Sequence, residues 1–197
     1  MKLAVLIMAA GASSRFGGCK LLAEYKGIPL VEHCIKNVLS LSAEYVYLVT
    51  GRWHREIIDA AEEDLISVDK VELQENLEWQ EGLGSSISFA INRLPEDCEK
   101  ILIVLADQVM VSEDELKQII SHGQSCDICC AVYEGRRGVP ALFDKTLLPE
   151  LGLLTGDQGA KRLLHDSSLD VIELPLPSAA QDIDTPEQLK QIREQRC

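Results

Sequence analysis

A short basic loop follows the first apolar segment of the chain and contains the residue types that bind phosphate. In "AAGASSRFGGCK", residues 9–20, the small residues leave backbone N–H groups accessible, and Arg15 and Lys20 supply two cations. Lys20 follows Cys19, whereas a Walker A loop needs glycine before its lysine, and the glycine spacing of a dinucleotide-binding loop is also absent. The loop therefore suits the binding of a triphosphate, but by a loop of a different class from these two. Taken alone, it could equally be an ordinary glycine-rich turn.

Carboxylates follow or precede other predicted elements. Asp107 comes directly after the apolar stretch "KILIVLA", and Asp182 and Asp184 lie in "QDIDTPEQL", just before a helical pattern that starts at Pro186. Thr185 is the better-placed N-cap of that helix, which leaves Asp184 free for another task. Asp107 is expected where a buried sheet meets a ligand crevice.

A third stretch, "NLEWQEGLGSSISFAI", places glycines before a predicted helix. Gly82 precedes Ser85 and Ser86, which are expected at the helix N-terminus. Such N-termini bind anions or present N–H groups to the edge of a base, whereas a serine-capped helix is the plain structural alternative. The combination of this stretch with the basic loop and Asp107 favours a ligand site.

The elements that must position these residues alternate along the chain. Continuous apolar stretches predict strands over 2–9, 45–51, 70–76, 100–107, 127–133, 139–143 and 170–176, and amphipathic spacing predicts helices over 28–41, 54–65, 85–94, 112–122 and 185–195. Ser112 and Glu115 form a capping-box pattern. We expect an α/β fold with a mostly parallel sheet covered on both faces, as one domain over residues 1–197, and ligands bind such sheets at the carboxyl ends of the strands.

Charge and composition restrict the partners. With 19 Lys+Arg against 32 Asp+Glu, the net charge is 19 − 32 = −13, which argues against nucleic acid or an anionic membrane as the main partner. The apolar start is too short for a membrane span and lacks the pattern of a secretory signal, so we expect a cytoplasmic protein.

The cysteines favour the same compartment. Seven are scattered along the chain, an odd number that suits reduced thiols better than a disulfide framework. Cys126 and Cys129 have CxxC spacing, but no second pair completes a metal site, so we interpret "DICCAVY" as a buried strand.

Seven ordered motifs resemble the MobA-like nucleotidyltransferases, and most of all their molybdenum cofactor cytidylyltransferase branch. The motifs are "LIMAAGASSRFGGCKLL", "VTG", "NLEWQEGLGSSI", "IVLADQ", "GRRGVPALF", "LTGDQGAKRLL" and "DIDTPEQL". The resemblance implies a three-layer, Rossmann-like GT-A fold. It also implies Mg²⁺-dependent transfer of a nucleotidyl group from an NTP to a phosphorylated acceptor, with release of pyrophosphate.

The resemblance also implies roles for individual positions. Catalysis would depend on Arg15, Lys20 and Asp107, and the metal would be held by Asp107 and Asp184, with Asp182 the less favoured alternative. The nucleotide would contact Ala9, Ala10, Gly11, Ala12, Arg15, Lys20, Gly82, Ser85 and Ser86. The acceptor would contact Arg137, Gly138, Pro140, Gly156, Asp157 and Gly159.

Two departures from the family pattern bear on the substrates. Val109 stands where many relatives have proline, a change that alters the loop geometry only slightly. Val139 stands where they often have histidine, and the loss of that polar group weakens molybdopterin as the acceptor. The "GLGSSI" stretch favours CTP as the donor. Two alternatives stay open: transfer to a sugar or polyol phosphate, and a non-catalytic carrier that hands molybdenum cofactor to a molybdenum hydroxylase.

Overall fold

A seven-stranded sheet forms the centre of the protein. The computed structural model describes residues 1–194, so Cys197 and the ends predicted for the last helix and the domain lie outside the described residues. The strands are β1 (Leu3–Ala9), β4 (Tyr45–Thr50), β5 (Glu72–Glu75), β6 (Lys100–Leu105), β7 (Ile128–Tyr133), β8 (Arg136–Asp144) and β9 (Val171–Pro175). Their order is β5-β4-β1-β6-β8-β7-β9, and β2 (Glu24–Tyr25) pairs separately with β3 (Ile28–Pro29).

Only β8 breaks the parallel arrangement of this sheet. It runs antiparallel to both β6 and β7, while the other neighbouring pairs are parallel. Between β7 and β8, Glu134 and Gly135 have φ values of +50° and +71°, the left-handed conformation that a two-residue hairpin turn needs. The segment predicted as a short strand over 139–143 is therefore the second half of a long hairpin strand.

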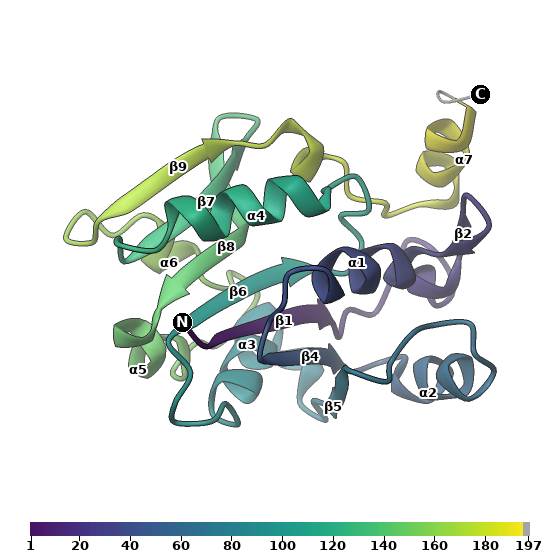
Figure 1. Cartoon of the computed structure of the whole chain (residues 1–197). Helices are drawn as coiled ribbons and strands as arrows, with labels where there is room; N and C mark the ends of the chain where they lie inside the picture. The colour runs from purple at the N-terminus through teal and green to yellow at the C-terminus, as the bar shows by residue number, and fades with distance from the viewer. Residues whose placement is uncertain (195–197) are drawn as a thin grey trace.

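Helices cover both faces of the sheet (Figure 1). They are α1 (Leu30–Leu39), α2 (His54–Glu62), α3 (Leu83–Ile91), α4 (Glu113–His122), α5 (Leu148–Leu151), α6 (Lys161–Leu164) and α7 (Pro186–Glu194). Alternate residues of β1 enter two separate cores: Val5 and Ile7 pack with α1, α2 and α4, and Leu6 and Met8 pack with α3, α5 and α6. Because successive side chains of a strand point to opposite faces, this pattern confirms the predicted three-layer α/β fold.

A smaller apolar cluster positions the end of the chain. Ile183 is fully buried and packs with Tyr25, Leu30, Val109 and Leu189, so α7 lies beside the β2–β3 hairpin (Figure 1). The segment with Asp182 and Asp184 is thereby held across the ends of the central strands. Within residues 1–194, no helix is long and apolar enough to cross a membrane.

Candidate active site

The carboxyl ends of β1, β4 and β6 meet at one edge of the sheet, because β1 pairs in parallel with both neighbours. The Ala106 N–H donates to the Met8 carbonyl at 3.1 Å, which continues the ladder past the end of β6 and places Asp107 beside the basic loop. A cavity of about 450 Å³ opens at this edge, in the size range of small-molecule sites.

Most of the residues predicted for the nucleotide and metal line this cavity. The cavity-lining members of the predicted set are Ala9, Ala10, Gly11, Ala12, Arg15, Lys20, Gly82, Ser86, Asp107, Asp157 and Asp184. Ser85, Arg137, Gly138, Pro140, Gly156 and Gly159 do not line it. The structure thus brings together five separate segments of the chain and leaves most of the predicted acceptor residues outside.

The four charged residues of the loop and the strand ends form one ion-pair network. Lys20 Nζ donates to Asp107 Oδ2 at 2.6 Å and to Asp184 Oδ1 at 2.8 Å. The Arg15 guanidinium donates to the other oxygen, Asp184 Oδ2, at 2.5 Å. The cations expected to bind phosphate are therefore bonded to the carboxylates expected to bind metal.

Burial and charge act in opposite directions on this network. Burial lowers the pKa of Lys20, but the charges and hydrogen bonds of Asp107 and Asp184 outweigh burial, so the pKa lies above its ordinary value. For Asp184, burial raises the pKa, and the bonds to Lys20 and Arg15 reverse the shift and bring the pKa below its ordinary value. Both groups are therefore charged at neutral pH.

Asp182 has a different environment from Asp184, although only Ile183 separates them. Asp182 does not line the cavity, and its Oδ1 atom is buried without a hydrogen-bond partner. Burial raises the pKa of Asp182 to about 6, and the nearby charges of Asp107 and Asp184 add to the rise. This geometry favours Asp184 over Asp182 as the residue that faces a ligand.

The donor set fits a hard divalent cation. Asp107 Oδ2 and Asp184 Oδ1 come from residues 77 positions apart (184 − 107 = 77) and converge on a single point, where the Lys20 ammonium nitrogen lies at 2.6 and 2.8 Å from them. Within residues 1–194, no group of three or more His, Cys, Asp or Glu side chains forms a complete metal site. Two carboxylates with the remaining positions filled by phosphate and water match the way Mg²⁺ is bound beside nucleotides.

Trp79 forms a wall of the cavity and packs against Gly51, a contact that the sequence did not reveal. Trp79 lies in a 3₁₀ turn (Trp79–Glu81) and lines the cavity, and its Cβ lies only 2.5 Å from where a Cβ on Gly51 would be. Glycine directly after β4 therefore lets the indole pack against the strand end. The "VTG" motif contains this glycine, but only the contact with Trp79 explains why glycine stands there.

The two adjacent serines of α3 share one partner. The Asn76 side-chain amide donates to Ser86 Oγ at 3.1 Å and to Ser85 Oγ at 3.4 Å. Ser86 lines the cavity, whereas Ser85 Oγ also donates to the Glu78 carbonyl at 3.3 Å, inside the preceding loop. Asn76, which sequence reasoning missed, thus braces the α3 N-terminus.

The loop predicted for the acceptor packs against the same helix start. The Gly84 N–H donates to the Gly156 carbonyl at 2.7 Å, and a Cβ on Gly82 would lie 2.3 Å from Asp157 Oδ1. Gly82 also has a φ of +103°, a left-handed conformation that favours glycine. Asp157 therefore reaches the cavity beside Gly82.

The β8 residues predicted for the acceptor have partners elsewhere. Arg137 Nε donates to Glu173 Oε1 at 2.7 Å, and its NH1 donates to the Leu164 carbonyl at 2.5 Å. A Cβ on Gly138 would meet the Tyr133 hydroxyl at 2.4 Å, so this glycine allows close packing within the β7–β8 hairpin. Both residues support the sheet in this structure.

The CxxC pair forms no metal site in the described part of the chain. Cys126 and Cys129 are free and buried, and burial raises the pKa of Cys126 and takes that of Cys129 to about 12. Both thiols are therefore protonated at neutral pH and pack as small apolar side chains, as predicted.

Comparison with known proteins agrees with this architecture. The purine catabolism protein PucB of Bacillus subtilis strain 168 is 28% identical over 194 residues, covering 95% of this chain and 94% of PucB. The crystal structure of Rv0371c from Mycobacterium tuberculosis H37Rv has a TM-score of 0.83 at 25% identity and covers 98% of both chains. The Rv0371c complex with manganese has a TM-score of 0.80 at 23% identity, covering 98% of this chain and 99% of that one.

A family model described as the MobA-like NTP transferase domain matches residues 5–171, which is most of the chain. This range contains the basic loop, the α3 N-terminus and Asp107, and Asp184 follows it. The protein therefore belongs to the MobA-like NTP transferase family and is a nucleotidyltransferase.

Proposed function

We propose that this protein transfers a nucleotidyl group, CMP in the first place, from an NTP to a phosphorylated acceptor with release of pyrophosphate. The proposed metal is Mg²⁺, the proposed acceptor is molybdopterin cofactor, and a molybdenum hydroxylase is the proposed recipient of the product. The observation that carries this proposal is the convergence of Arg15, Lys20, Asp107 and Asp184 on one cavity at the carboxyl edge of the sheet.

The charged residues have complementary tasks in such a transfer. Both reactants are anionic, so catalysis consists mainly of neutralising charge and holding the attacking and leaving oxygens in line. Arg15 and Lys20 would donate to the phosphate oxygens and balance charge on the departing pyrophosphate. Asp107 and Asp184 would hold Mg²⁺, which when bound polarises the phosphoryl oxygens and orients the triphosphate. The manganese complex of Rv0371c supports a divalent cation.

No protein nucleophile or general base is required. The attacking group is an acceptor phosphate, which is already ionised near neutral pH. The backbone of residues 9–12 would lie along the nucleotide, where small side chains permit close approach. Gly82 and Ser86 would meet the base and ribose, whereas Ser85 supports the loop through the Glu78 carbonyl.

The choice of CTP as the donor and of molybdopterin as the acceptor rests on a resemblance to the cytidylyltransferase branch. The stretches that carry it are "GLGSSI", "GRRGVPALF" and "LTGDQGAKRLL". Among the proposed acceptor residues, Asp157 lines the cavity and is the first to test. Arg137 would have to leave Glu173 and the Leu164 carbonyl to reach a ligand.

Thermal shifts with CTP, GTP, ATP and UTP, each with Mg²⁺, test the donor, because a ligand that binds the native state raises its stability. We expect the largest shift with CTP. No shift with any of the four would contradict nucleotidyl transfer and favour the carrier alternative.

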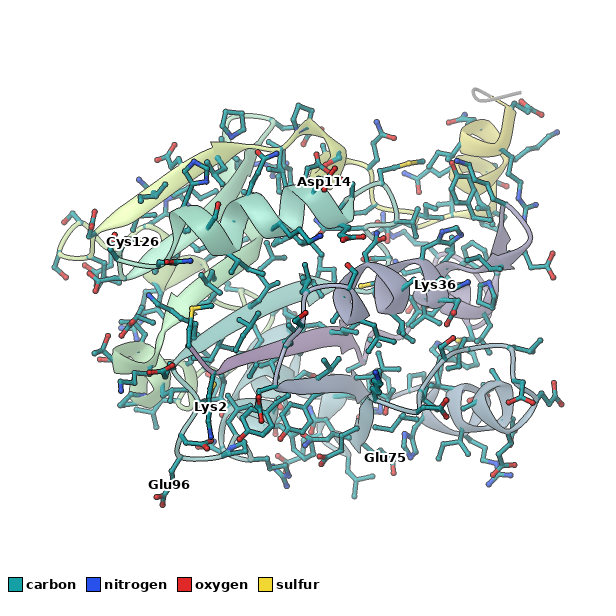
Figure 2. The ribbon with its side chains drawn as sticks, viewed as in Figure 1. Lys2, Lys36, Glu75, Glu96, Asp114 and Cys126 are labelled. Atoms are coloured by element: carbon teal, nitrogen blue, oxygen red, sulfur yellow. The ribbon has the colours of Figure 1, made fainter. Side chains whose placement is uncertain are left out.

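Pyrophosphate release with the best donor then tests the acceptor. Molybdopterin cofactor, a sugar phosphate and a polyol phosphate are compared, and release with either of the latter two alone would refute molybdopterin. Asp107→Asn should lower release about 100-fold or more, since a bound metal supplies several kcal/mol of charge stabilisation. Asp114→Asn, at an exposed position of α4 (Figure 2), is the matched control and should retain activity.

A further inference from the structure

Both oxygens of Asp184, and one of Asp107, are already bonded within the protein. Lys20 Nζ lies between Asp107 Oδ2 and Asp184 Oδ1, at 2.6 and 2.8 Å. Arg15 takes Asp184 Oδ2 at 2.5 Å. A divalent cation that uses the two facing oxygens therefore competes directly with the Lys20 ammonium.

The ion pair at the centre of this network is largely shielded from water. The side chains of Lys20 and Asp107 are 12% and 17% exposed, whereas the Arg15 side chain is 72% exposed. A charge in such surroundings is costly once its partner is removed, much more so than a charge in a surface ion pair. Separating Lys20 from its carboxylates therefore costs much free energy unless another anion replaces them.

We propose that Lys20 is the resident counter-ion of the two carboxylates and that metal and triphosphate enter together by exchanging ion pairs with it. Asp107 and Asp184 would hold the metal, and Lys20 and Arg15 would turn to the phosphate oxygens. This inference rests on the proposed function. It adds that binding of the metal without the triphosphate is unfavourable.

The charge count explains the coupling. Asp107 and Asp184 carry two negative charges, and Lys20 and Arg15 carry two positive charges, so the network is balanced as it stands. If a metal ion bound alone, the buried Lys20 ammonium would lose its carboxylate partners. If a triphosphate bound alone, the two negatively charged carboxylates would repel it. Only the joint entry of both ligands gives every charge a new partner.

The exchange predicts opposite effects of one substitution. Lys20→Met removes the competitor of the metal and also removes a phosphate donor. The affinity for Mn²⁺ alone should therefore rise about fivefold or more, the lower end of ordinary coupling factors, while the affinity for CTP in the presence of Mn²⁺ falls. A lysine that only binds phosphate would leave the affinity for Mn²⁺ alone unchanged.

The experiment measures free Mn²⁺ by electron paramagnetic resonance during titration of the full chain, first alone and then with CTP. Lys20→Met is compared with the wild type and with Lys36→Met. Lys36 is a half-exposed lysine on α1 (Figure 2), bonded to Glu32 at a distance of 3.4 Å, and its loss should change neither affinity. Lys20→Gln, whose amide can still donate to a carboxylate, replaces Lys20→Met if the apolar side chain prevents folding.

The outcomes separate this inference from the proposed function. Tighter Mn²⁺ binding with weaker CTP binding in the Lys20 variant supports the exchange. Unchanged or weaker Mn²⁺ binding in a folded Lys20 variant overturns the exchange, even when the wild type binds Mn²⁺ and CTP together. A wild type that binds CTP neither with nor without Mn²⁺ overturns the proposed function, and the exchange with it.

Discussion

Replacing Gly51 by alanine should damage the fold and the cavity together, because this glycine follows β4 directly under a cavity wall. Its Cβ would lie 2.5 Å from Trp79 Cβ, 2.7 Å from Trp79 Cγ and 2.8 Å from the Ala10 carbonyl oxygen. Carbon atoms in ordinary contact are about 3.5–4.0 Å apart, so Trp79 would have to move by about 1 Å. Ala10 and Trp79 both line the cavity, so the displacement reaches the ligand site.

Overpacking of this kind costs about 1–3 kcal/mol of unfolding free energy. At about 2–4 °C per kcal/mol for a domain of this length, a 2 kcal/mol loss lowers the Tm by about 4–8 °C. Urea unfolding followed by circular dichroism measures the free energy, and the thermal shift with CTP and Mg²⁺ measures ligand binding. We expect both to fall.

Gly18→Ala is the matched control, because a Cβ there would have no atom within 4 Å and its φ is not left-handed. It should change stability by less than about 1 kcal/mol. In the double variant, Trp79→Gly removes two of the three close contacts of the new methyl group, those to Trp79 Cβ and Cγ, so the two substitutions should cost less together than the sum of their separate costs. If Gly51→Ala matches Gly18→Ala in stability and CTP binding, the packing argument is wrong.

Two further predictions concern stability. Asp182 has a folded-state pKa of about 6 against an ordinary 3.8, so its proton stabilises the fold fully below about pH 4, and this contribution is lost as the pH rises through 6. Between about pH 4 and pH 7, the unfolding free energy of the wild type should fall by about 1–2 kcal/mol relative to that of Asp182→Asn, a range that includes a discount for partial exposure. Urea unfolding measures both values. A difference between the two proteins that does not change with pH would contradict the assignment. Ser112→Ala should lower the unfolding free energy by about 1 kcal/mol in the same assay, because it breaks a capping box. In that box Ser112 Oγ accepts from the Glu115 N–H at 3.3 Å, and Glu115 Oε2 accepts from the Ser112 N–H at 2.8 Å. An unchanged value would show that the capping box contributes nothing.

Local patterns were sufficient for the strands of the central sheet, for the longer helices and for one edge of the site, but they did not reveal α5, α6 or the β2–β3 hairpin. The apolar stretch before Ala10 and the one before Asp107 are buried β1 and β6, so the residues after them lie at the same sheet edge. The N-cap role of Thr185 is confirmed, since its Oγ1 accepts from the Gln188 N–H at 3.2 Å. These features depend on neighbours in sequence, and periodicity and capping report such neighbours directly.

Features that depend on distant contacts were not predictable in the same way. The direction of β8 follows from its hairpin with β7 and its insertion beside β6, and the alternation of apolar residues does not distinguish it from a parallel strand. The "GRRGVPALF" stretch resembles acceptor-side motifs, yet Arg137 bonds to Glu173, 36 residues later. Trp79 was visible as a residue, but its contact with Gly51 required the packed structure.

The sequence by itself determined the layered α/β class, the strand ends that carry polar residues and, through its ordered motifs, the MobA-like NTP transferase family. Only the tertiary structure decided which charges meet. Lys20 and Asp184 are 164 positions apart, and their contact depends on the strand order and on the burial of Ile183, which holds the last segment across the sheet edge. Short-range patterns carry no information about that distance, so the ion-pair network of Arg15, Lys20, Asp107 and Asp184 appears only when the chain is folded.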